Sequence, residues 1–156
     1  MALVTENILL VKEKCRIDIQ KNPGVSKSLQ ALFMHLNTIG NPDLKYASID
    51  YTGNADIVVS DSACRLYAWC LQKPTASTTD AWPKMSDHAT VASANGDVVM
   101  KLIGTGGGGR QYCPTFQDGL IMGTGITTAS HTTVNGSTDS SDADAAVGFA
   151  IVGANA

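Results

Sequence analysis

The amino-acid sequence predicts an all-β protein, a β-sandwich or jelly roll, with an N-terminal extended arm and one short α-helix. Of the 14 acidic residues only Glu6 and Glu13 are glutamate, while Ser, Thr and Gly are abundant. Aspartate and these small residues suit turns and strand edges, whereas helical surfaces favour Glu and Lys. Short apolar or alternating runs recur between Gly, Pro and Asn, a spacing typical of sandwiches and jelly rolls. A single stretch has helical periodicity.

The chain divides into an N-terminal region of arm and helix, residues 1–45, and a β-sandwich domain, residues 46–156. In the first region, LVTENILLV (residues 3–11) and RIDI (residues 16–19) favour short strands or an extended arm. Six basic and four acidic residues give this region a net charge of +2. The second region has five basic and ten acidic residues and a net charge of −5.

A helix is predicted within residues 22–40. Four apolar residues recur there at i, i+3, i+4 and i+7, so they share one helical face that we expect to pack in the core. Ser26 or Ser28 is suited to cap the start, and Gly40 followed by Pro42 ends the pattern. The residues of the apolar face are Leu29, Leu32, Phe33 and Leu36.

From Tyr46 onward the sequence reads as strands separated by turns. Asn95-Gly96 stands between two strand-like runs and is the strongest hairpin signal in the chain. A polar loop covers residues 73–88. The remaining strand-like runs are residues 46–52, 56–60, 64–71, 111–116, 119–130 and 145–154.

The segment LIGTGGGGRQYCP, residues 102–114, contains four consecutive glycines and fits G-x-G-x-x-G. A phosphate-binding loop needs a helix directly after it, because the free N–H groups at the helix start hold the anion. Pro114 and Gly119 oppose such a helix, and Arg110 stands where a P-loop has lysine. We therefore expect no cofactor, and we interpret the loop as a connection between two adjacent strands.

Charge and hydropathy argue against two classes of partner. No basic cluster is present to bind nucleic acid, and the acidic second region would repel a phosphate backbone. Apolar runs such as residues 8–11 are far too short to span a bilayer, and the start does not read as a signal peptide. We expect neither nucleic acid nor a membrane as partner.

Motifs typical of catalysis or metal binding are missing. His35, His88 and His131 are dispersed, and neither G-x-S-x-G nor H-E-x-x-H occurs. GSTDSSDADA (residues 136–145) has carboxylates for calcium but lacks the EF-hand pattern, which favours a solvated loop. We predict that the protein is not an enzyme.

The four cysteines are expected to be small buried hydrophobic residues in a reducing compartment. Cys64 and Cys70 lie six positions apart on a predicted strand, hence on one face and roughly 20 Å apart, too far for a disulfide. No C-x-x-C occurs to suggest zinc.

Three aromatic residues are candidates for a binding surface. Trp69, in the middle of a strand, is expected in the core. Trp82, which precedes Pro83 in a polar loop, is the better contact candidate. With Tyr67 and the Asp/Asn loops it would form the site of an alternative function, a carbohydrate-binding receptor-recognition module.

Three stretches carry a resemblance to a known class of protein: RLYAWCLQ (65–72), the segment at residues 98–130, and VGFAIVGA (147–154). A strand that begins "LY", a Gly-rich turn, a "GL-M-TGI" segment and an aliphatic last strand resemble small jelly-roll or β-sandwich virion proteins of tailed bacteriophages. The resemblance covers roughly residues 46–156.

The resemblance implies a structural virion protein, assembled in the host cytoplasm, that stabilises the capsid as a decoration (cement) protein. Its partners would be the major capsid protein or other virion proteins, and it would form a homo-oligomer, with a trimer favoured. A tail or neck accessory protein is the alternative. The residues expected to contact partners are Leu3, Ile8, Leu10, Trp82, Gly106, Gly107, Gly108 and Arg110.

Overall fold

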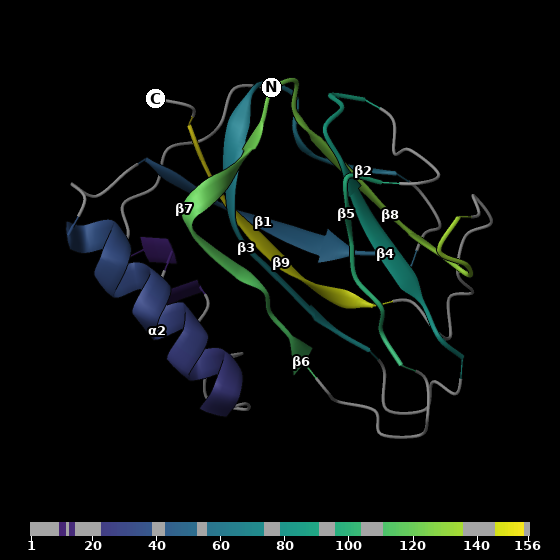
Figure 1. Ribbon diagram of the computed structural model, residues 1–156, viewed down its shortest axis with the longest axis horizontal. Coiled ribbons are helices and arrows are strands. Elements are labelled where there is room, and N and C mark those ends of the chain that lie inside the picture. The colour runs from purple at the N-terminus through teal and green to yellow at the C-terminus, as the bar shows by residue number, and fades with distance from the viewer. Residues whose placement is uncertain are drawn as a thin grey trace.

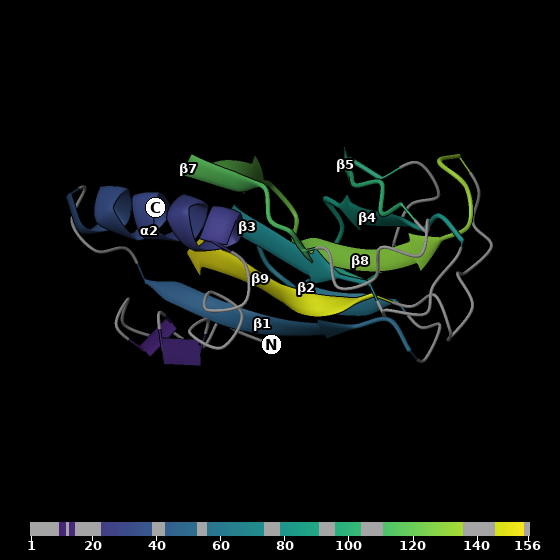
Figure 2. The same ribbon diagram turned by 90° about the horizontal axis from the view of Figure 1, so that it is seen from below.

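The protein is a β-sandwich of a five-stranded and a four-stranded antiparallel sheet with one helix packed outside, which confirms the predicted fold class. Figures 1 and 2 show this computed structural model. The residues that the structure describes are 10–11, 13–14, 23–38, 43–52, 56–73, 79–90, 96–103, 111–135 and 146–154.

The five-stranded sheet has the order β1-β9-β3-β6, and β7 pairs with β3 beside β6. Its strands are β1 (Leu44–Asp50), β9 (Val147–Ala154), β3 (Cys64–Gln72), β6 (Gln111–Tyr112) and β7 (Thr115–Met122).

The four-stranded sheet has the order β2-β8-β4-β5. Its strands are β2 (Ile57–Ser60), β8 (Ile126–His131), β4 (Trp82–Ser86) and β5 (Val98–Val99). Apolar side chains from both sheets meet in one cluster, which we call the inter-sheet core. Its larger members include Ile49, Val59, Leu66, Trp69, Leu71, Met85, Leu102, Met122, Ile126 and Val152.

Helix α2 (Pro23–Thr38) covers the opposite face of the five-stranded sheet, so that this sheet lies between the helix and the second sheet (Figure 1). The predicted apolar face is confirmed: Leu29, Leu32, Phe33 and Leu36 are all buried. They form a second cluster, the helix-side core, with Val11, Leu44, Tyr67, Ala68, Cys70, Phe149 and Ile151.

The start of the helix differs from the prediction. It begins at Pro23, so Ser26 and Ser28 lie inside the helix. Proline suits the first helical turn, because the N–H it lacks would have no partner there. The helix ends at Thr38, whose hydroxyl donates to the Met34 carbonyl oxygen at 3.0 Å.

Strand β3 supplies alternate side chains to the two cores, and a β-bulge between Leu66 and Ala68 shifts that alternation by one residue. At the bulge two successive residues, Tyr67 and Ala68, both face the helix side. Beyond them, the residues that face the helix and those that face the second sheet are therefore exchanged relative to a regular strand. As a result Cys64 lies in the inter-sheet core and Cys70 in the helix-side core. The prediction that these two cysteines share one face is therefore wrong.

The N-terminal arm is not extended where the structure describes it. Leu10, Val11, Glu13 and Lys14 have helical backbone. Val11 is buried in the helix-side core, so a tertiary contact favours a conformation that the local sequence did not predict. Of the contact residues proposed in the arm, Leu3 and Ile8 lie outside the described residues.

Gly96 is a turn residue with a positive φ of 64°. A Cβ atom there would lie 2.8 Å from the Cβ of Lys84, so a side chain would meet both backbone strain and a clash. The strand after this turn, β5, pairs with β4 in the register Lys84↔Val99. β5 therefore pairs with β4, a strand that ends ten residues before Gly96. The sequence had predicted that β5 would pair with the run directly before Asn95-Gly96.

The residues that flank the glycine segment belong to different sheets. Leu102 forms a bridge with Ala81 beside the four-stranded sheet, while β6 pairs with β3 in the five-stranded sheet. The segment therefore crosses between sheets, and the prediction that it joins adjacent strands is wrong. Gln111 and Tyr112 are strand residues, so no helix begins where a phosphate-binding loop would need one.

None of the described helices is long and apolar enough to span a bilayer.

Asp87 fixes the loop that leads into β8. Its carboxylate accepts backbone N–H groups from Gly123 at 2.8 Å, Thr124 at 2.7 Å and Gly125 at 3.3 Å. Partial burial works to raise the pKa of Asp87, but hydrogen bonds from Thr124, Gly123 and Gly125 outweigh it and hold the pKa below its ordinary value. The ionised carboxylate therefore stabilises the folded loop.

Replacing Asp87 with alanine should lower the free energy of unfolding at neutral pH by about 1–3 kcal/mol, because three N–H groups lose their acceptor. Since the folded-state pKa is depressed, the stabilisation is present above the unfolded pKa of about 3.9 and is lost as the pH falls through the folded-state value. Urea unfolding should therefore show a difference from wild type that shrinks below about pH 4. Asp43→Ala, at an exposed aspartate, is the control; a pH-independent difference would contradict this role.

Candidate functional site

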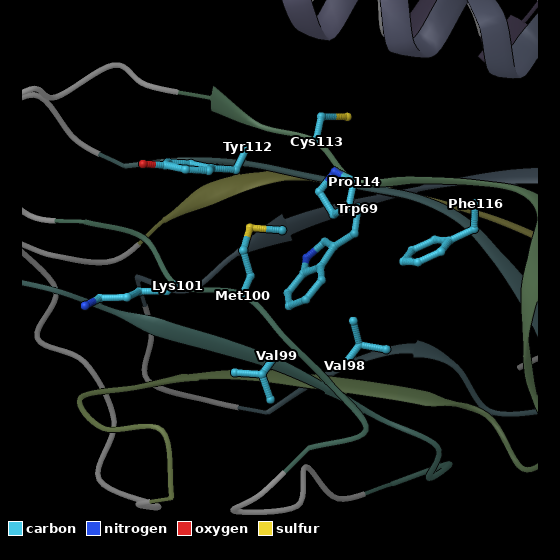
Figure 3. Close-up of a pocket in the computed structure, with 9 residues that line it drawn as sticks. All are labelled: Trp69, Val98, Val99, Met100, Lys101, Tyr112, Cys113, Pro114 and Phe116. Atoms are coloured by element: carbon cyan, nitrogen blue, oxygen red, sulfur yellow. The ribbon is translucent and has the colours of Figure 1, made fainter.

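A cavity of about 590 Å³ lies between the edges of the two sheets (Figure 3). One wall comes from β5 and the two residues after it, and the other from β6 and the start of β7. Its walls are mostly apolar, which is typical of binding pockets. The lining residues are Trp69, Val98, Val99, Met100, Lys101, Tyr112, Cys113, Pro114 and Phe116.

Trp69 projects from β3 into the centre of this cavity, between Met100 and Phe116 (Figure 3). It is fully buried, so the expectation that it belongs to the core is confirmed. The same residue nevertheless lines the cavity, and the cavity is therefore an opening into the inter-sheet core.

Tyr51 joins the two sheets deeper in the core. Its hydroxyl bonds to the Thr128 hydroxyl at 2.6 Å, and Thr128 in turn donates to the Lys84 carbonyl oxygen at 2.7 Å. Burial raises the pKa of Tyr51 far above its ordinary value, against opposing contacts with Thr128 and Trp69. The phenol is thus neutral at physiological pH and serves as a structural donor.

Lys101, which lines the cavity, also contacts Trp82 of β4. The Lys101 ammonium lies 5.1 Å from the centre of the Trp82 ring and 2.9 Å from the Asp80 carboxylate. Trp82 is half-buried beneath it. Trp82 remains a candidate for partner contact, now as part of a cation–π pair.

Tyr67 and Trp82 do not form the aromatic platform predicted for a sugar site. Tyr67 lies in the helix-side core and Trp82 in the other sheet, so the two rings cannot stack on one ligand. The Tyr67 ring instead covers Gly119 and Gly153, where a Cβ atom would lie 2.9 Å and 2.7 Å from ring carbons. Burial of Tyr67 raises its pKa.

Only two of the predicted contact residues can be placed. Leu10 is exposed and Trp82 is half-buried. The others, Leu3, Ile8, Gly106, Gly107, Gly108 and Arg110, lie outside the described residues, as does the acidic segment 136–145.

The three histidines remain separate in space. His35 of α2 lies 3.3 Å from the Asp118 carboxylate, His88 accepts the backbone N–H of Thr90, and His131 is buried at the end of β8. Within the described ranges, no group of three or more His, Cys, Asp or Glu side chains is arranged to hold a metal ion.

Cys70 and Cys113 form a disulfide between β3 and the residue after β6. The expectation of reduced, unpaired cysteines is therefore wrong for this pair and holds for Cys64, which is free and buried. The register Leu71↔Tyr112 brings the two cysteines opposite each other. Sequence reasoning missed the bond because the 43-residue separation gives no local signal.

Comparisons of the chain with family models, with curated proteins and with solved structures give no match.

The disulfide should contribute about 4 kcal/mol to the free energy of unfolding, because it closes a loop of 43 residues in the unfolded chain. Reduction should therefore lower the thermal midpoint of the wild type and leave that of Cys70→Ser/Cys113→Ser unchanged. The Cys64→Ser variant, which keeps the bond, is the control. Peptide mapping after alkylation without reductant should recover a linked Cys70–Cys113 peptide; two alkylated cysteines there would refute the pairing.

Proposed function

We propose that this chain is a structural virion protein that decorates a phage capsid and stabilises it through contacts between subunits. It acts by adhering to other proteins and performs no reaction of its own. A tail or neck location is the alternative within the same class.

The observation that carries this proposal is that four of the nine exposed large apolar side chains in the described residues lie on strands with a free side. Val58 is on β2, Val99 on β5, and Leu120 and Ile121 on β7, with exposed fractions from 36% to 58%. In the described sheets β2 and β5 are the two edges of one sheet, and β7 is paired with β3 alone.

Edge strands with exposed apolar residues favour association. An edge strand presents N–H and C=O groups that no neighbouring strand pairs, and natural monomers usually protect such edges with charges, proline or covering loops. Apolar residues at these positions gain free energy when another subunit removes them from water. The distribution therefore supports an assembly function.

The resemblance of residues 65–72, 98–130 and 147–154 to phage virion proteins supports the setting of that assembly. Two of these stretches coincide with strands that hold the molecule together, β3 and β9, and the middle one includes the apolar edges of β5 and β7. In such a protein the central strands would give rigidity and the edges would give contacts.

Gradient-purified virions provide the direct test. Mass spectrometry should find the chain at many copies per particle, and cryo-electron microscopy of the same particles should place its density on the capsid exterior. Density at the tail or neck would support the alternative. A chain present only in the particle-free fraction would contradict a virion role.

Replacing Ile121 with lysine should weaken association with capsids, or among copies of the chain, by at least about tenfold, because an exposed apolar contact becomes a charge. Monomer stability should change by less than about 0.5 kcal/mol, since the site is exposed. Gln117→Lys adds the same charge at an exposed polar position of β7 and is the matched control. Equal affinities for both variants in sedimentation velocity would argue against an apolar contact at β7.

A further inference from the structure

We propose that the edge formed by residues 98–103 accepts an extended segment of a second copy of this chain, residues 3–9, with Glu6 opposite Lys101. The added segment would lie beside β5 as a further strand of the four-stranded sheet. This inference rests on the proposed assembly function and names a partner and a surface for it.

The backbone of residues 98–103 is paired on one side. Met100 donates its N–H to the Pro83 carbonyl oxygen at 2.9 Å, and Leu102 exchanges hydrogen bonds with Ala81 at 2.9 and 3.0 Å. In an antiparallel pair, the groups of alternate residues point the opposite way. The N–H and C=O groups of Val99, Lys101 and Ile103 therefore point away from β4.

These outward groups form an available edge. Among the described residues, the backbone of Val99, Lys101 and Ile103 makes no hydrogen bond outside the β4–β5 ladder, in which Val99 lies opposite Lys84. Three alternate residues with free donors and acceptors are the template that an added strand requires.

The side chains along this edge alternate in the same way. Met100 and Leu102 belong to the inter-sheet core, while Val99, Lys101 and Ile103 are exposed on the side turned away from that core, with Val99 and Lys101 also lining the cavity mouth. The outer face therefore reads apolar, cationic, apolar at two-residue spacing. A strand that adds here would be favoured if its outer face read apolar, acidic, apolar.

The chain itself contains such a segment. Val4, Glu6 and Ile8 have the complementary pattern at the same spacing, so Glu6 lies opposite Lys101 whether the added strand is parallel or antiparallel.

The inner face of this segment carries Leu3, Thr5, Asn7 and Leu9. Its apolar ends suit the cavity walls, and its polar centre faces an opening that includes the Tyr112 hydroxyl (Figure 3).

The donor of the segment is a second copy. Within one copy, Val11 is buried in the helix-side core, on the face of the five-stranded sheet that is turned away from β5 (Figure 1). A symmetric pairing of two β5 edges would set Lys101 against Lys101 and is disfavoured. The contact is therefore head-to-tail, which generates a closed ring or a filament.

Charge reversal tests the pairing on the full-length chain. Glu6→Lys and Lys101→Glu should each weaken self-association roughly tenfold in sedimentation velocity, and the double reversal should restore it. Lys27→Glu, at an exposed lysine of α2, is the control for a change in net charge. Circular dichroism establishes that each variant is folded, since Lys101 also contacts Asp80 and Trp82.

A synthetic peptide of residues 1–10 provides a second readout. It should compete with the donor segment and dissociate the assembled wild-type chain, while the same peptide with Glu6→Lys should not. If an apolar dye enters the cavity but the peptide has no effect, the cavity is a small-molecule site and the inference is overturned. A monomeric wild-type chain, or a double reversal that fails to restore association, also overturns it.

The two proposals fail in different ways. If both single reversals leave association unchanged while the chain is found on purified virions, the pairing is wrong and the proposed function stands. If the charge swap behaves as expected but the chain is absent from virions, the pairing stands and the virion role is wrong.

Discussion

Burial of β3 on both faces is the constraint on which the architecture depends. The bulge after Leu66 lets one strand send Trp69 and Leu71 into the inter-sheet core and Tyr67 and Cys70 into the helix-side core. Because both cores share this strand, the helix layer and the sandwich stabilise each other. The apolar content of β3 is what a strand without a solvent face requires.

The sequence allowed the elements with local signals to be predicted. Helix α2 followed from a 3.6-residue period and most strands from apolar runs between turn residues. The partners of those strands could not be read in the same way. Pairing of β5 with β4, the passage of the glycine segment between sheets and the Cys70–Cys113 bond all join residues far apart in the chain.

In the candidate site, too, features with a local sequence signal could be predicted and features made by distant residues could not. Trp82 was singled out as an aromatic residue in a predicted polar loop, although it is the first residue of β4, whereas the cavity brings together Trp69, Met100 and Phe116 from three separate stretches. The helical turn at Val11 was missed because its burial against the helix-side core, a tertiary contact, decides its conformation. The sequence thus indicated one candidate contact residue but not the cavity, because residues from distant parts of the chain form its walls.

The disulfide has a mechanical consequence for the edge at residues 98–103. It encloses β4, β5 and this edge in one covalent ring anchored on β3. Tension applied at the edge would pass to β3 through a sulfur–sulfur bond as well as through hydrogen bonds. If the edge binds another subunit, as we propose, strands that peel away under load would stay attached to β3 through this bond.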